Sequence, residues 1–541
     1  MNIIAQRSLW NRMLPVAVRQ NARLIFGSLL LIVATGFILG TFQIRPVVFA
    51  SDSVLDVNEI TFNVRGNQDF FDLSVPHRID LAINDIEYQK MIRDFQVLGE
   101  KSWILVDATI DGVYIPSVGV RLKGNSTLFA LGGDGPMGMR ARFGGRGRGM
   151  QGMEGMPDME RMEEMAGSLV GGASFEEPSS LPLLISFNEF YPGRAFQGYP
   201  ELALRPANVG SSSMNEALSL QLIADTGQVS QDYSWVEFSI NGGSTATRLV
   251  LENPNQQYAY RINQGRGVLY KSTSENKFEY KGEDSTGYID DFDQLNGIGN
   301  MDLAPVIAFL RWMDAASDEV FDAELAERLD IPSFAKYVVT QDLLGNFDDM
   351  AGPGRNFLFW YSLETSKFTV ITWDMNLALI GDNPMAMMMR RPPPGMSPPE
   401  GAAGFTPPSG MTPPPGMENM DQSEIMEMMA NNAQAEPPAG MPFPMMGGDQ
   451  VGMLDFFENM PDIPGMPTIG NQLKDRFVAS EAFSSDIDAA RAELSALWTV
   501  ENVSNLIDEL SLAVPASDIL TSEHIALDIQ KLKQNISSML R

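Results

Sequence analysis

Two neighbouring segments carry the side chains best suited to chemistry. The first, Gln341 to Trp360 (QDLLGNFDDMAGPGRNFLFW), is predicted to end a helix in an acidic loop, and the second, Lys367 to Leu379 (KFTVITWDMNLAL), to be a strand that ends at Trp-Asp. Asp348 and Asn356 come from the first segment and Asp374 from the second. Phosphoryl transfer needs a carboxylate to orient the attacking hydroxyl, and oxygen ligands that hold Mg²⁺ against the nucleotide phosphates. These residues supply that set, although the same spacing also fits an N-cap aspartate and a turn.

The composition of the chain excludes several other chemistries. There is no cysteine, which removes disulfides, thiolate catalysis and cysteine-ligated metal centres. The two histidines, His77 and His524, are too few for a three-histidine metal site, and we predict that both are structural. Acidic residues outnumber basic ones by 69 to 38, and the net charge of −31 disfavours binding to nucleic acid. The chemistry is therefore expected to depend on carboxylates, lysine and a cation.

The elements that must position these residues follow an α+β order, with strands first and helices later. Alternating or β-branched runs predict strands in the N-terminal half, and apolar residues at helical spacing predict helices after them. The predicted strands are 77–84, 102–110, 117–124, 182–187, 234–241 and 247–253. The predicted helices are 213–227, 301–316, 323–331, 331–346, 487–498 and 523–540.

Two segments interrupt this pattern, at 132–180 and 384–467. They are dense in methionine, glycine and proline and hold 8 and 17 methionines, which is 25 of the 34 in the chain. Such a composition cannot bury a regular apolar face, so we predict two disordered insertions. Methionine thioethers are soft ligands, and the clusters could bind Cu(I); the alternative is a flexible linker without a ligand.

The N-terminus predicts the compartment. Residues 24–42 form an uncharged apolar stretch, close to the length of about 20 residues that spans a bilayer, and four arginines precede it. By the positive-inside tendency we predict a cytoplasmic basic tail (1–23), a transmembrane signal anchor (24–42) and an extracytoplasmic body from residue 51. The alternative is a signal peptide cleaved before Ser51, which would give a secreted protein.

The motifs of the body resemble those of one known family. The order GN-x-D, N-F-L-F and W-D over residues 345–374 resembles the catalytic segment of the CotH (spore coat protein H) family of atypical, protein-kinase-like phosphotransferases. Further stretches are similar in the same order: VGVRLKGNSTL at 118–128, the run 182–206, the helix that follows it, RLVLENPNQQY at 248–258 and GVLYKS at 267–272. The resemblance covers most of residues 70 to 380 and, more loosely, the C-terminal helices.

The resemblance implies a role for each residue of the acidic segment. Asp348 would be the catalytic aspartate, with its neighbour Asp349 as the alternative base. Asn356 and Asp374 would be metal ligands. The family often has a second acidic residue where this chain has Asn376, so Asn376 would be a weaker ligand or none. The spacing from Asp348 to Asn356 is longer than in ordinary kinases, and AGPG fills it.

The resemblance also implies the nucleotide contacts and the activity. Lys123 would bind the phosphates, Glu252 would pair with a nucleotide-binding lysine, and Lys271 would be an alternative phosphate contact. The usual Gly-rich phosphate loop of kinases is not visible. The implied fold is a two-lobed, kinase-like domain over 51–541 that uses ATP with Mg²⁺ or another divalent cation to phosphorylate a protein hydroxyl. Because ATP is scarce outside the cytoplasm, the alternative is a non-catalytic kinase-fold surface scaffold or a methionine-rich copper-binding protein.

Overall fold

The computed structural model describes residues 60–124, 128, 173–207, 210–297, 303–381 and 470–540. All of them belong to one compact unit. The predicted tail and anchor (1–42) and nearly all of the two predicted insertions lie outside the described residues. Among the helices of the described ranges, none combines the length and the apolar composition needed to cross a membrane.

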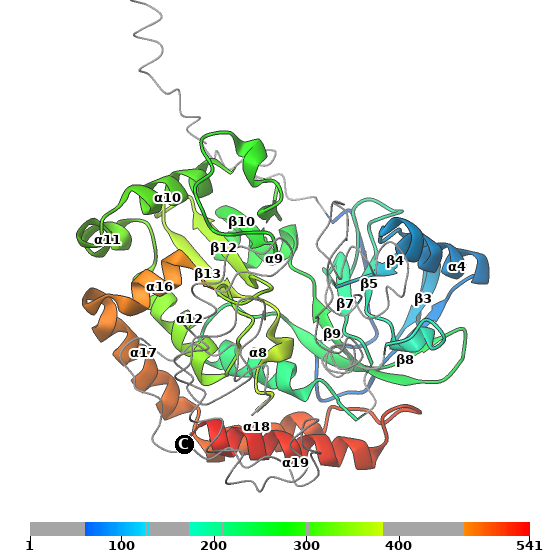
Figure 1. The fold of residues 1–541 in the computed structure, drawn as a ribbon. Coiled ribbons are helices and arrows are strands. Elements are labelled where there is room, and N and C mark those ends of the chain that lie inside the picture. The colour runs from blue at the N-terminus through cyan, green and yellow to red at the C-terminus, as the bar shows by residue number, and fades with distance from the viewer. Residues whose placement is uncertain are drawn as a thin grey trace, which may run out of the picture. The chain divides into compact units, whose positions relative to one another are not determined.

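A closed barrel of seven strands forms the first half of the described body (Figure 1). Its strands, in their order around the barrel, are β2 (His77–Ala82), β3 (Ile104–Ile110), β4 (Val113–Leu122), β5 (Leu183–Ser186), β7 (Glu201–Leu204), β9 (Ala246–Glu252) and β8 (Tyr233–Ile240). The β2–β8 pair that closes the ring is parallel, and the other neighbours are antiparallel. Each of the six predicted strands coincides with one of these. Along β2 buried and more exposed residues alternate, with Ile79 and Leu81 inside, and this alternation is the sequence pattern that predicts a strand.

A four-stranded antiparallel sheet and its helices form the second half. The strand order is β11 (Phe292–Gln294), β10 (Gly267–Ser272), β12 (Phe357–Ser362) and β13 (Phe368–Thr372). The surrounding helices are α9 (Gln256–Arg261), α10 (Ala304–Ala315), α11 (Asp318–Glu324), α12 (Ile331–Leu343), α16 (Gln472–Ala479) and α17 (Ser484–Leu497). Ring contacts among Phe278, Phe309, Phe357, Phe359 and Phe368 join the sheet to α10.

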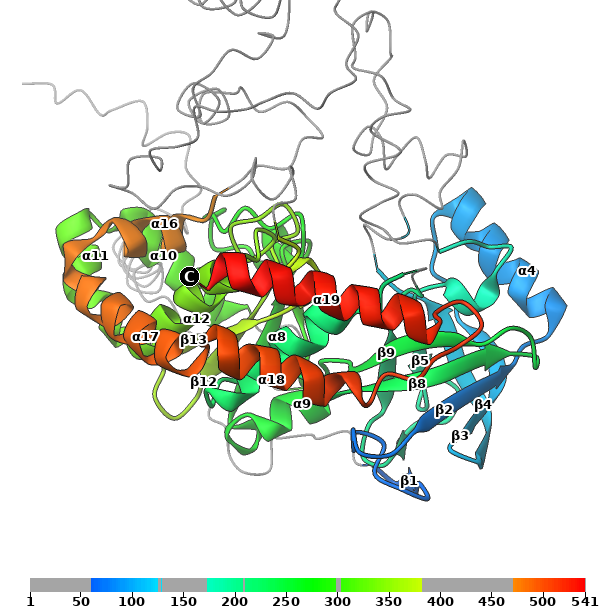
Figure 2. The same cartoon turned by 90° about the horizontal axis from the view of Figure 1, so that it is seen from below.

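Three helices lie between and beneath these two parts. The largely buried α8 (Met214–Asp225) follows β7, and the two C-terminal helices α18 (Val500–Ser511) and α19 (Ser522–Met539) both pack against it. Figure 1 shows α18 and α19 below α8, and Figure 2, seen from below, shows them side by side in front of it. The remaining elements are β1 (Phe62–Val64), β6 (Arg194–Phe196), α4 (Asp85–Arg93) and short helical turns.

Two sequence predictions need correction. The helix predicted over 323–331 is wrong: α11 ends at Glu324, a 3₁₀ turn follows, and Leu329 pairs with Phe368 of β13 before Asp330 caps α12. The pairing with β13 overrides the helical preference of the sequence there.

The second correction concerns the end of the first predicted insertion. Residues 173–180 fold onto the barrel instead of being disordered. Phe175 packs against the barrel core, and the backbone carbonyl of Ser179 accepts a hydrogen bond from the buried Arg248 (2.6 Å). A composition averaged over the whole insertion concealed these anchoring residues.

The structural role predicted for His77 leads to a testable pH dependence. His77 is buried, and its Nδ1 lies 2.7 Å from Asp111 Oδ2 in the β3–β4 turn. Burial alone would lower the pKa of His77, but Asp111 and the Asp72 carbonyl raise it by more, so the net shift is upward. A raised folded-state pKa gives stability that is fully present below the unfolded-state pKa of about 6.5 and is lost as the pH rises through the folded-state value.

We therefore expect Asp111→Asn to cost about 1.5–3 kcal/mol at pH 6 and progressively less at higher pH. Asparagine retains the preference of Asp111 for the left-handed backbone (φ 47°), so the turn itself is conserved. Urea unfolding of both proteins between about pH 5 and pH 9 measures the difference. A cost that does not change with pH would show that Asp111 does not raise the pKa of His77.

Candidate active site

The loop between α12 and β12 folds around the carboxylate of Asp348. That carboxylate accepts hydrogen bonds from the Gly354 N–H (2.5 Å) and from Asn356 Nδ2 (2.9 Å). A Cβ at Gly354 would lie 2.6–2.8 Å from the Asn356 amide and both Asp348 oxygens, so only glycine allows this approach. The AGPG insert thus explains the long spacing, because it brings Asn356 back to Asp348.

The environment of Asp348 suits a residue that exchanges a proton. Burial is the largest cause that raises its pKa to about 7, and the negative charges of Asp374 and Asp349 add to it. The Gly354 N–H and the Asn356 amide oppose this shift. The structure therefore brings Asp348 and Asn356 into contact and places Asp374 near enough for its charge to act on Asp348.

Asp374 lies at the end of β13 in an unusual backbone conformation. Its φ of 57° and ψ of 72° are left-handed, a region that non-glycine residues adopt rarely and mostly at functional sites. Arg205, directly after β7, donates a hydrogen bond from Nη2 to Asp374 Oδ1 (2.6 Å). The same guanidinium also pairs with both oxygens of Glu216 on α8, with an Nε–Oε2 distance of 2.7 Å.

Arg205 and Glu216 were not singled out in the sequence. Glu216 has only 1% of its surface exposed, and a buried ionised carboxylate requires a partner. The available signal for Glu216 was an acid in the first turn of α8 that lies among residues expected to be buried. Nothing local identified Arg205 as its partner, because their contact with Asp374 joins three distant elements.

Several basic side chains lie near the two carboxylates of Asp348 and Asp374. Lys123 follows β4 and Lys271 lies in β10, and both ammonium groups lie over the ring of Trp373, at 5.9 Å and 5.4 Å from its centroid. Burial, together with the charges of Lys271 and Arg205, lowers the pKa of Lys123 to about 7. The two lysines predicted to contact phosphate therefore meet at Trp373, the residue before Asp374.

Two more cations extend the cluster. The Arg121 side chain leaves the same face of β4 as Lys123 and lies over the Trp103 ring, 4.8 Å from its centroid. Lys101 donates a hydrogen bond to the Gly124 carbonyl (2.6 Å), and burial, with Arg121 and Lys271, lowers its pKa to about 8. A chain with a net charge of −31 thus concentrates positive charge at this one place.

The remaining predicted residues have other surroundings. Asp349 is buried, pairs with Lys474 and accepts a hydrogen bond from the Ala351 N–H (2.8 Å), so it holds the loop together. Glu252 pairs with Arg261 instead of a lysine, and it is the adjacent Asn253 that accepts a hydrogen bond from Lys123 (2.8 Å).

Asn376 forms part of the 3₁₀ turn after Asp374. Its backbone carbonyl accepts a hydrogen bond from Asn215 Nδ2 on α8 (2.8 Å), and so does the carbonyl of Ala378 (2.9 Å). Asn376 is thus held through its backbone carbonyl. The turn is therefore held in place by α8.

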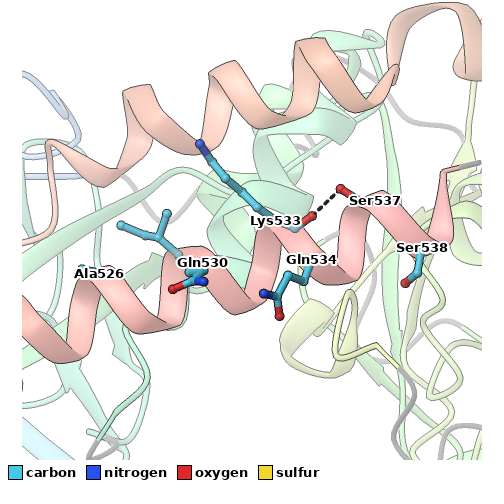
Figure 3. Close-up of a pocket in the computed structure, with 7 residues that line it drawn as sticks. Ala526, Gln530, Lys533, Gln534, Ser537 and Ser538 are labelled. Carbon is cyan, nitrogen blue, oxygen red and sulfur yellow. Dashed lines mark hydrogen bonds between the residues drawn. The ribbon is translucent and has the colours of Figure 1, made fainter.

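Two of the cavities are lined by residues of the described part of the chain. One, of about 600 Å³, is lined by Glu201, Arg194 and the amides of Asn188, Asn255, Gln256 and Gln257. Glu201 connects this cavity to the cations, because it accepts a hydrogen bond from Asn253, the partner of Lys123. The other, of about 550 Å³, runs along α19 past Gln530, Lys533 and Gln534 (Figure 3) and contains none of the predicted residues.

The donor set at Asp348 and Asp374 fits a magnesium ion. Magnesium is usually held by one or two carboxylates together with substrate phosphates, and two carboxylates and an amide oxygen are what this site offers. Within the described ranges, no group of three or more histidine, cysteine or acidic side chains is arranged to hold a metal ion. A metal at this site would therefore need oxygen ligands from a bound phosphate as well.

Fold and site together define a mixed α+β protein in which an acidic pair and an amide lie next to a cluster of cations. The chain belongs to the CotH kinase protein family, whose model matches residues 171–514. It is also 22% identical over 192 residues to the inner spore coat protein H of Bacillus subtilis (strain 168), a match that covers 34% of this chain and 51% of that protein. The chain thus spans about half the length of the curated relative. Lys123 lies outside the matched range.

Proposed function

We propose that the protein transfers the γ-phosphate of ATP to a hydroxyl group of a protein substrate. The observation that supports this most is the convergence of the Asp348–Asn356 pair, Asp374 and the cations around Trp373 from four separate parts of the chain. Carboxylates alone would suggest a site for a bound cation, and basic side chains alone would suggest a site for a bound anion. Their meeting suits a polyphosphate bound together with a divalent cation.

Each side chain has a role in this proposal. Asp348 accepts the proton of the attacking hydroxyl, whose oxygen bonds to the γ-phosphorus while the bond to the bridging oxygen breaks and ADP leaves. Asp374 and Asn356 would hold Mg²⁺, which neutralises charge on the phosphates when bound. Lys123 and Lys271 bind the phosphates, and Asp349 serves the structure of the loop. We also propose a two-lobed, kinase-like arrangement and a body that is exported and tethered by residues 24–42.

Transfer of label from γ-phosphate-labelled ATP to added proteins, or to the protein itself, tests this activity. We expect incorporation that requires a divalent cation, together with thermal stabilisation by ATP and Mg²⁺. Neither incorporation nor stabilisation by any nucleotide would reject the proposal and favour the non-catalytic scaffold.

Nucleotide binding should also take up a proton at Lys123. Because the pKa of this lysine is lowered to about 7, most of it is neutral at pH 8, and nearby phosphate charge will raise the pKa again. We expect uptake of up to about one proton per bound nucleotide at pH 8 and much less at pH 6. Calorimetric titrations in two buffers of different ionisation enthalpy measure this uptake.

Lys123→Met is the variant to compare in the same titrations, since methionine keeps much of the side-chain length without the charge. We expect weaker binding and a smaller proton uptake. Lys336→Met, at a lysine whose partner Glu493 is exposed to solvent, serves as the control. Undiminished uptake in Lys123→Met would assign the proton to another group.

A further inference from the structure

The first turn of α8 holds both Asp374 and the residues that follow it. Glu216 fixes Arg205, which donates to the Asp374 carboxylate. Asn215, the preceding residue, donates from Nδ2 to the carbonyls of Asn376 (2.8 Å) and Ala378 (2.9 Å). The position of the candidate metal ligand therefore depends on where α8 begins.

The beginning of α8 lacks the usual local support. Its N-cap residue, Ser213, has a left-handed backbone (φ 57°) and makes no side-chain capping bond. The support comes from α19 instead: Asp528 Oδ2 accepts hydrogen bonds from the backbone N–H of Ser212 (2.8 Å) and from its hydroxyl (2.7 Å). A carboxylate beside a helix N-terminus also complements the helix dipole.

The same helix contacts the segment after Asp374. Asn535 Nδ2 donates to the Leu379 carbonyl (3.0 Å). At Gly381 (φ +71°), an added Cβ would lie 2.5 Å from Asn535 Oδ1, so the chain passes directly against this side chain. Asp528 and Asn535 are seven residues apart, which places them on one face of α19 about two turns apart.

We propose that α19 is a positioning element of the candidate active site, and that Asp528 and Asn535 are its positioning residues. Asp528 fixes the start of α8, and Asn535 fixes the segment that leaves Asp374. Together they hold α8, which contacts Asp374 through Arg205, and the segment after Asp374 in fixed positions relative to each other. This inference rests on the proposed phosphotransfer function, and it extends the site to a helix more than 150 residues away in the sequence.

The test uses Asp528→Ala, Asn535→Ala and the milder Ser212→Ala in the full-length protein. A displacement of about 1 Å in reacting groups can cost about 10²-fold in rate, so we expect kcat to fall about tenfold or more in the first two variants and about two- to threefold in the third. KM for the protein acceptor should stay unchanged. Asp528→Asn keeps an acceptor oxygen for Ser212 and should restore most of the rate. Gln534→Ala, exposed and next to Asn535 in sequence, is the control.

Amide hydrogen exchange separates this inference from the proposed function. We expect faster exchange at residues 212–220 and 374–381 in Asp528→Ala and Asn535→Ala, with the barrel strands unchanged. Wild-type rates and exchange in both variants would overturn the positioning role while phosphotransfer stands. If the wild-type protein transfers no phosphate, the proposed function fails, and the exchange data alone decide whether α19 holds these segments. Exchange that rises uniformly over the whole body would show a merely structural role for α19.

Discussion

Replacing Asp374 with asparagine is expected to lower the rate of phosphate transfer by about 10²–10³-fold. Asparagine keeps the shape of the side chain and an oxygen that can still accept the hydrogen bond from Arg205. It removes the negative charge that would hold Mg²⁺, so the loss should be partly recovered at high Mg²⁺ or with Mn²⁺. It also tolerates the left-handed backbone at this position. Initial rates measured over a range of divalent cation concentrations check this result.

The matched control is Glu364→Gln on the turn between β12 and β13. Glu364 is exposed and belongs to the same hairpin as Asp374. Its replacement changes the net charge by the same amount without touching the site. Equal label incorporation by wild type and by Asp374→Asn would remove Asp374 from the mechanism. Equal losses in both variants would attribute the effect to the overall charge.

Replacing Arg205 with alanine is expected to have the largest effect on stability. Breaking a buried ion pair by removing one partner costs about 3–5 kcal/mol, since the remaining charge stays buried and unpaired. Here the change leaves Glu216 without its guanidinium and frees Asp374. Arg205→Lys should recover only part of the loss, because an ammonium group cannot form the paired contact with Glu216 and reach Asp374 together. Denaturant unfolding measures both variants.

A double-mutant cycle with Glu216 tests the physical reason. If the cost comes from an unpaired buried carboxylate, Arg205→Met combined with Glu216→Leu should be more stable than Arg205→Met alone. Activity should nevertheless stay low in the double variant, because Asp374 has lost its anchor. Additive costs in the cycle would contradict the coupling between Arg205 and Glu216.

Local patterns in the sequence were enough to predict much of the fold. The strands of the barrel alternate or are β-branched, so their positions could be predicted before their order around the ring. Asp348 and Asn356 are eight residues apart, and a loop of that length brings them together without distant contacts. By contrast, α18 was missed although Val503, Ile507 and Leu510 line one face, because its polar residues concealed the periodicity.

The contacts that cross the fold could not be predicted from the sequence. Arg205, Glu216 and Asp374 meet only because β7, α8 and β13 converge, and sequence spacing contains no information on that convergence. Glu252 was expected to pair with a lysine, yet α9 turns back immediately after β9 and brings Arg261 to it. Lys123 and Lys271 were predicted as alternatives, and the structure places both at the same tryptophan.

The way in which the ring of strands closes determines how the protein can be divided. The range shared with the family starts at residue 171, after β2, β3 and β4, and ends before α19. A fragment cut to that range would leave β5 and β8 with open hydrogen-bonding edges and the apolar interior of the barrel exposed to water, and such edges promote aggregation. We therefore expect a soluble fragment to need β2, β3 and β4 in addition to the range that matches the family.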